Sequence, residues 1–112
     1  MKLTSLFICV VRDQDALRLA EVLREENISF TKLASTGGFL REGNTTFLIA
    51  TDEKTKEKVK QLVRTTCARR EETIESTLPV NEPLGPYLPQ KVKVERGGGI
   101  LLEIPIQYYE RF

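Results

Sequence analysis

The sequence contains no histidine and no tryptophan, and it has only two cysteines among its 112 residues. Without histidine, the Ser-His-Asp and Cys-His catalytic systems are excluded, and so is the most common general base of enzymes. Cys9 and Cys67 form no C-x-x-C motif, which argues against a structural zinc site, and no P-loop or G-x-G-x-x-G motif is present. These absences favour a binding protein over an enzyme, although a pair of carboxylates that hydrolyses glycosides leaves no signature in a sequence.

Neither charge nor hydrophobicity is concentrated in one part of the chain. The 17 basic and 16 acidic residues give a net charge of +1, whereas a dedicated DNA- or RNA-binding domain usually carries a basic stripe. The most apolar stretch, residues 3–11, is too short to span a membrane and lacks the cleavage site of a secretion signal. We therefore expect one cytoplasmic domain over residues 1–112, with reduced thiols and with neither nucleic acid nor membrane as a partner.

The spacing of apolar residues predicts alternating strands and helices. Strands are expected over residues 3–11, 28–33, 45–50, 91–95 and 100–106, and helices over residues 16–25 and 53–69. Asp13 or Asp15 is expected to cap the first helix and Asp52 the second, because a carboxylate accepts the free amide protons of a first helical turn. The order of the elements predicts an α+β fold, a ferredoxin-like β-α-β-β-α-β sandwich.

Two features are predicted for the second half of the chain. The prolines between residues 79 and 89 predict a long irregular loop over residues 76–90, after the second helix. A loop of this length is uncommon in a compact domain unless it is functional or flexible. The three glycines at 97–99 predict a β-hairpin between strands 91–95 and 100–106.

The predicted strands are apolar on both faces. In the first strand, residues 6, 8 and 10 are as apolar as residues 7, 9 and 11. Two helices can cover one face of the sheet, so the other face needs a separate cover. The simplest cover is another copy of the same chain, and cyclic symmetry is the usual arrangement of such copies.

Residues 31–46 combine two glycine breaks with several hydroxyl side chains and two large apolar residues. Gly37 and Gly38 allow backbone amides to approach a ligand closely, and successive amides in such a turn form an anion site. Phe39 and Leu40 suit an apolar wall or a stacking surface for a base. This stretch is therefore a candidate binding segment.

Three polar residues of the same stretch fit a nucleotide. Asn44 offers both a donor and an acceptor, which suits the edge of a purine, and Lys32 or Arg41 could bind a phosphate. A plain strand-loop-strand connection with glycines in its turns explains the same residues equally well. The residues alone leave both interpretations open.

The motif T-G-G-F-L-R-E-G-N-T-T at residues 36–46 closely resembles the T-G-G-F-L-R-x-G-N-T-T segment of the PII-like cyclic-di-AMP receptor proteins. The resemblance extends over nearly the whole chain, through D-Q-D at 13–15, T-K-L-A at 31–34, T-C at 66–67 and the glycine-rich turn before the last strand. The long motif is specific, whereas the glycine turn alone would be a weak signal.

The resemblance implies a PII-like homotrimer that binds cyclic-di-AMP in the clefts between neighbouring subunits, with no further cofactor. The residues that match ligand-contacting or pocket positions are Asn27, Thr31, Gly38, Phe39, Leu40, Asn44 and Ala50, with Gly37 beside them in the turn. Ser29 stands where some relatives have an arginine near a phosphate, and Arg111 stands where some have a glutamine. We interpret Arg111 as a partial replacement for the missing cation.

The function implied by the resemblance is regulatory. Ligand bound between subunits changes the conformation of a loop, for which residues 76–90 are the candidate, and an unidentified protein partner responds. The first alternative is an ATP- or ADP-sensing PII protein, but those proteins have a long loop where this chain has only residues 34–44. A trimeric scaffold or metal-tolerance protein without a nucleotide is the second alternative. An enzyme acting on nucleotides is the third, and it would need an activated water or nucleophile.

Overall fold

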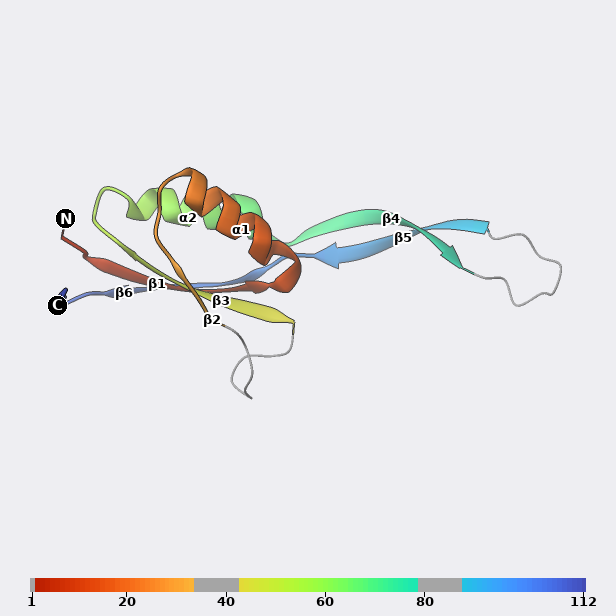
Figure 1. Ribbon diagram of the computed structural model, residues 1–112. Helices are drawn as coiled ribbons and strands as arrows, with labels where there is room; N and C mark the ends of the chain where they lie inside the picture. The colour runs from red at the N-terminus through yellow and green to blue at the C-terminus, as the bar shows by residue number, and fades with distance from the viewer. Residues whose placement is uncertain (1, 34–42, 79–87) are drawn as a thin grey trace.

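The computed structural model describes residues 2–33, 43–78 and 88–112 (Figure 1). The strands in these ranges are β1 (Ser5–Arg12), β2 (Thr31–Leu33), β3 (Asn44–Thr51), β4 (Arg70–Leu78), β5 (Leu88–Arg96) and β6 (Gly99–Pro105), and the helices are α1 (Asp13–Glu25) and α2 (Lys56–Cys67). Within the described ranges, neither helix combines the length and the apolar composition that crossing a membrane requires.

Four strands form one antiparallel sheet in the order β2-β3-β1-β6. Both helices lie on the same side of this sheet (Figure 1). With β6 as its last strand, the sheet and its two helices form the predicted α+β, ferredoxin-like β-α-β-β-α-β sandwich. The predicted fold class is therefore confirmed.

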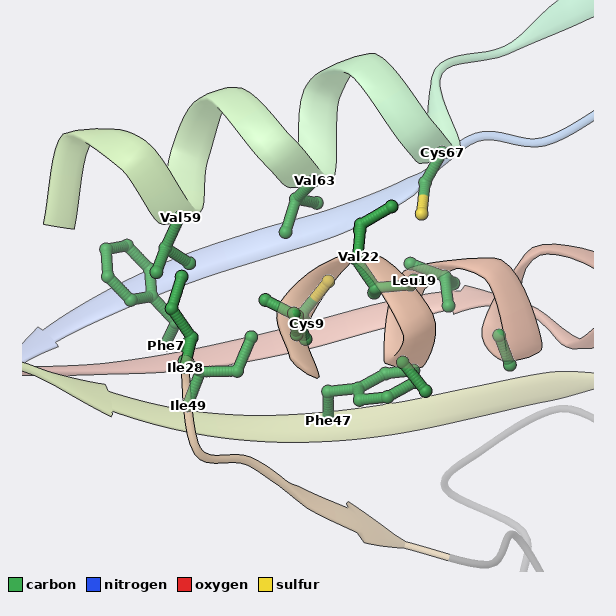
Figure 2. Packing of buried hydrophobic residues seen from close by; sticks show 14 residues of the cluster. Phe7, Cys9, Leu19, Val22, Ile28, Phe47, Ile49, Val59, Val63 and Cys67 are labelled. Carbon is green, nitrogen blue, oxygen red and sulfur yellow. The ribbon is translucent and has the colours of Figure 1, made fainter. Parts of the chain in front are cut away.

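The hydrophobic core lies between the helices and the sheet (Figure 2). Because alternate residues of a strand point to the same face, Phe7 and Cys9 of β1 and Phe47 and Ile49 of β3 all enter the core, where they are fully buried. The helices contribute Ala16, Leu19, Ala20, Val22 and Leu23 from α1 and Val59, Val63 and Cys67 from α2. Burial of one large apolar side chain contributes about 1.5–3 kcal/mol, so these contacts are what hold the helices on the sheet.

The opposite face of the sheet is covered by no element in the part of the chain that the structure describes. We call it the open face. Its apolar residues are Leu6, Ile8 and Val10 of β1, Leu48 and Ala50 of β3, and Ile100, Leu102 and Ile104 of β6, as the strand register shows. The sheet is therefore apolar on both sides, as the sequence predicts.

The starts of both helices differ from the prediction. The N-cap residue of α1 is Arg12, so neither Asp13 nor Asp15 caps this helix. The second helix begins later than predicted, because Asp52 accepts a hydrogen bond at 2.9 Å from the backbone amide of Thr55 and thereby stabilises a turn that precedes the helix. The two carboxylates at the start of α1 make tertiary contacts instead.

The predicted hairpin between residues 91–95 and 100–106 is wrong. β5 pairs with β4 along its whole length, and β6 pairs with β1 in the main sheet. The β4–β5 pair forms a two-stranded ribbon that projects from the end of the sheet (Figure 1). The predicted irregular loop over residues 76–90 is also wrong at both ends, since β4 and β5 extend into it, and residues 79–87 lie outside the described part.

The glycines at 97–99 connect the ribbon to the sheet rather than forming a hairpin turn. Gly97 and Gly98 have φ angles of 78° and 88°, a conformation that side chains disfavour. The amide of Gly98 donates a hydrogen bond to the carbonyl of Cys67 at 2.7 Å. A Cβ atom at Gly99 would lie 2.3 Å from the carbonyl oxygen of Val10, so only glycine allows β6 to join β1 here.

Candidate functional site

A cavity of about 580 Å³ lies between the α1–β2 connection, the open face and the C-terminal tail. We call it the tail cavity. Five of the predicted ligand-binding residues line it, namely Asn27, Ser29, Thr31, Ala50 and Arg111. The other lining residues are Leu3, Leu6, Ile28, Phe30, Leu48, Thr51, Asp52, Thr55 and Tyr109. Residues from both ends of the chain and from its middle thus meet at one place.

The end of α1 positions Asn27 in this cavity. Asn27 has a φ angle of 58°, and its amide donates to the carbonyl of Arg24 at 3.0 Å, while the amide of Ile28 donates to the carbonyl of Leu23 at 2.9 Å. This pair of bonds is a Schellman motif, which ends a helix and turns the chain. The second strand consequently begins at Thr31, whereas the sequence predicted a start at residue 28.

The strand register supplies the floor of the tail cavity. Thr31 lies opposite Leu48, and Leu6 lies opposite Ala50. Because directly opposed residues point to the same side of a sheet, all four belong to the open face. The cavity therefore has an apolar floor with a hydroxyl group at its edge, and the small side chain of Ala50 leaves room above the floor.

The charges of the tail cavity have opposite signs. Arg111 supplies a guanidinium group, and Asp52 supplies a carboxylate. The hydrogen bond from the Thr55 side chain, with that from its backbone amide, lowers the pKa of Asp52, so this carboxylate is ionised at neutral pH. Such a cavity suits a ligand that presents both an anionic group and a hydrogen-bond donor.

Asn44 lies in a different cavity, of about 1190 Å³, at the base of the β4–β5 ribbon. We call it the hairpin cavity, and its lining residues are Val10, Arg12, Asp13, Gln14, Gly43, Asn44, Arg69, Glu95, Gly97, Gly98, Gly99 and Ile100. Asn44 and Ala50 stand at opposite ends of β3, about 20 Å apart at the usual rise of a strand. Within one subunit, the structure does not bring Asn44 together with the other five residues.

The remaining predicted residues, Gly37, Gly38, Phe39 and Leu40, lie outside the described residues, and their roles stay predictions. The described chain resumes at Gly43, whose φ angle is 92° and whose carbonyl accepts a hydrogen bond at 2.8 Å from the amide of Asp13. The start of α1 therefore holds the point at which this segment enters β3.

Several polar contacts beside the hairpin cavity were not expected from the sequence. The pairs are Asp13 with Thr45, Asp15 with Arg70 and Gln14 with Arg96. The only signal in the sequence was the D-Q-D motif itself, for which helix capping was the only role predicted. Tyr109 was also missed, although it lines the tail cavity together with Arg111.

Comparison with known proteins agrees with this fold. A protein-family model described as a cyclic-di-AMP receptor matches residues 1–112, the whole chain. A crystal structure described as that of a functionally unknown protein from Pediococcus pentosaceus ATCC 25745 is similar, with 34% sequence identity, a TM-score of 0.76 and coverage of 100% of both chains. The family match confirms the resemblance detected in the sequence, and we conclude that the chain belongs to the cyclic-di-AMP receptor family.

Proposed function

We propose that this protein is a cytoplasmic receptor that binds cyclic-di-AMP as a homotrimer. In this proposal the dinucleotide lies between neighbouring subunits and regulates a protein partner by changing the conformation of a loop. Membership of the cyclic-di-AMP receptor family supports the ligand and a role in signalling. The observation that carries the site is that Thr31, Asn44 and Ala50, which the family resemblance assigns to the ligand, all lie on the open face.

The apolar surface of the open face supports assembly with other copies. Ile100, Leu102 and Ile104 of β6 keep 60%, 50% and 42% of their surface exposed in the single chain. A contiguous apolar patch of this kind marks an interaction surface in a water-soluble domain. Another copy of the chain is the simplest cover, and cyclic symmetry gives every copy the same neighbours.

The separation of the two cavities supports a site shared between copies. A dinucleotide with two bases and two phosphates needs two sets of contacts, and one chain presents Asn44 and Arg111 in different cavities. We place cyclic-di-AMP where the hairpin cavity of one copy meets the tail cavity of its neighbour. Asn44 would then read a purine edge, and Arg111 would neutralise a phosphate.

The proposed action is binding without catalysis and without a further cofactor. A receptor family implies recognition rather than turnover. Both thiols of the chain, Cys9 and Cys67, are buried, and a buried cysteine is a poor nucleophile. Buried reduced thiols also fit the proposed location in the cytoplasm.

Calorimetric titration with cyclic-di-AMP, ATP and ADP, together with native mass spectrometry, tests the proposal. We expect a trimer that binds one cyclic-di-AMP per subunit and that prefers it to ATP and ADP. A stable monomer would contradict the shared site, and a preference for ATP would favour a nucleotide sensor of the other PII type. Hydrolysis of cyclic-di-AMP during incubation would contradict the non-catalytic role.

A further inference from the structure

The first turn of α1 contacts the residues that lead into β3. Thr45 Oγ1 donates a hydrogen bond to Asp13 Oδ1 at 2.5 Å, and the backbone amide of Asp13 donates to the carbonyl of Gly43 at 2.8 Å. Beside them, Arg12 Nη1 contacts Asn44 Oδ1 at 3.4 Å. The position of Asn44 therefore depends on the start of α1.

The same helical turn contacts the base of the β4–β5 ribbon. Arg70 donates from Nη2 to Asp15 Oδ1 at 2.7 Å and from Nη1 to Asp15 Oδ2 at 3.3 Å. Arg96 Nη1 donates to Gln14 Oε1 at 3.0 Å. The side chain of Asp15 is only 5% exposed, whereas that of Arg70 is 38% exposed. The two parallel bonds make this pair stronger than a surface ion pair with a single bond.

Glu72 joins the two arginines to each other at the ribbon base. Its Oε1 lies 3.1 Å from Arg70 Nε, and its Oε2 lies 3.6 Å from Arg96 Nε. Arg70 and Arg96 are also directly opposed in the β4–β5 register. The base of the ribbon is therefore one connected unit, supported by the first turn of α1 (Figure 1).

We propose that the turn formed by Asp13, Gln14 and Asp15 couples residues 43–45 to the orientation of the β4–β5 ribbon. This inference rests on the proposed function, in which Asn44 contacts the ligand. Ligand bound at Asn44 replaces the long contact between Asn44 and Arg12. It thereby shifts Thr45, the next residue of β3, against Asp13. Because the three residues belong to one helical turn, they move together, and the ribbon base follows them. These hydrogen bonds are the contacts that differ between the two states, as any ligand-driven change requires.

The length of the ribbon amplifies such a movement. β4 has nine residues, which extend about 30 Å at the usual rise of a strand. A rotation of about 10° at the base would displace the far end of the described strand by about 5 Å over that length. A small change beside Asn44 thus becomes a change in surface shape that a protein partner can detect.

A spin label on the ribbon measures its orientation in the full-length protein. We would use T73C, because Thr73 is exposed on β4 while Cys9 and Cys67 are buried and do not take up the label. In a symmetric trimer, pulsed dipolar spectroscopy between the three labels gives one distance. We expect cyclic-di-AMP to shift this distance in the protein that carries T73C alone.

Two variants break the coupling at its two sides, outside both cavities. Thr45→Val removes the hydroxyl donor to Asp13 and keeps the side-chain shape, and Arg70→Lys keeps the charge but cannot form the two-bonded pair with Asp15. We expect both variants to bind cyclic-di-AMP within about threefold of the parent and to lose more than about half of the ligand-induced shift in distance. Glu21→Gln on the exposed side of α1 is the matched control and should keep the full shift.

The outcomes separate this inference from the proposed function. If the parent protein does not bind cyclic-di-AMP or gives no intersubunit distance, the proposed function fails and the coupling fails with it. If cyclic-di-AMP binds but leaves the distance unchanged, or shifts it equally in the parent and in both variants, the coupling alone is wrong. Thr45→Val lies away from the ribbon, so a loss of shift in this variant cannot be ascribed to an unfolded ribbon.

Discussion

Asn44 is the residue on which the proposed recognition of a purine depends most directly. Its side chain lines the hairpin cavity, and among the described residues its one side-chain hydrogen bond is the long contact with Arg12. Its removal should therefore leave the fold intact. We predict that Asn44→Ala weakens cyclic-di-AMP binding by roughly 1–3 kcal/mol, because a buried base edge would lose its partner. Calorimetry measures this change, and Gln61→Ala on the exposed surface of α2 is the control amide. Unchanged affinity in an intact trimer would remove Asn44 from the site.

The thiols of Cys9 and Cys67 should make the free energy of unfolding depend on pH in the alkaline range. Burial, with a smaller effect of the neighbouring Cys67, raises the pKa of Cys9 from 9.0 to about 12. Burial, together with the negative charge of Asp15, raises the pKa of Cys67 from 9.0 to about 11. Above pH 9 the unfolded chain loses thiol protons that the folded chain keeps, so the free energy of unfolding should fall as pH rises from about 9 to about 11.

Chemical denaturation at pH 8, 9 and 10 checks this prediction, and Cys9→Ala with Cys67→Ala should remove that part of the decline. The same burial predicts that a disulfide reagent modifies neither thiol in the native protein at pH 8, whereas both react in guanidinium. Rapid modification of either thiol in the native protein would contradict the burial.

The site residues selected from the sequence can be compared with the structure one at a time. Five of the selected residues line one cavity, namely Asn27, Ser29, Thr31, Ala50 and Arg111. They were selected by matching a whole family pattern rather than from local chemistry, and their contact with a ligand stays a prediction. Contacts such as that between Thr45 and Asp13 were missed, because they join residues that are distant in the sequence.

The helices are held on the sheet by the apolar side chains whose spacing predicts burial. Helix α1 contains both a buried and an exposed leucine. Leu19 is fully buried against the sheet, whereas Leu17 is 66% exposed. We predict that Leu19→Ala lowers the free energy of unfolding by about 2–5 kcal/mol, through lost burial and a cavity. Leu17→Ala, the matched control, should change it by less than about 0.5 kcal/mol. Urea denaturation at one fixed protein concentration measures both, and equal effects would mean that α1 faces the sheet differently.

The elements that were mispredicted lack such periodicity. β4 begins with three charged residues, which Thr73, Ile74 and Glu75 follow. The strand belongs to a two-stranded ribbon, and none of its residues 70–75 is buried, so no apolar pattern marks it. β6 was correctly predicted as a strand but was assigned the wrong partner. Its glycine-rich approach resembles a hairpin turn locally, whereas the pairing with β1 is decided by the empty sheet edge beside that strand.

At the scale of the whole molecule, the open face should decide both assembly and binding. We predict that Leu102→Glu gives a folded monomer that no longer binds cyclic-di-AMP, because a carboxylate would be buried without a partner at the interface between copies. Native mass spectrometry measures the oligomeric state, circular dichroism the folding and calorimetry the binding of cyclic-di-AMP. Leu17→Glu on the outer side of α1 is the control and should remain a trimer. If Leu102→Glu stays trimeric, copies do not meet through this face.

The sequence by itself determined the α+β class and the order, along the chain, of the helices and of the strands that form the main sheet. It also determined that these strands are apolar on both faces, and it indicated the family. Each of these depends on local periodicity or on a continuous motif, which folding does not alter. Only the tertiary structure decided that β6 pairs with β1, that the β4–β5 ribbon projects from the sheet, and that Asn44 and Arg111 line different cavities. The physical reason is that strand pairing and cavities depend on contacts between distant residues, which no local pattern encodes.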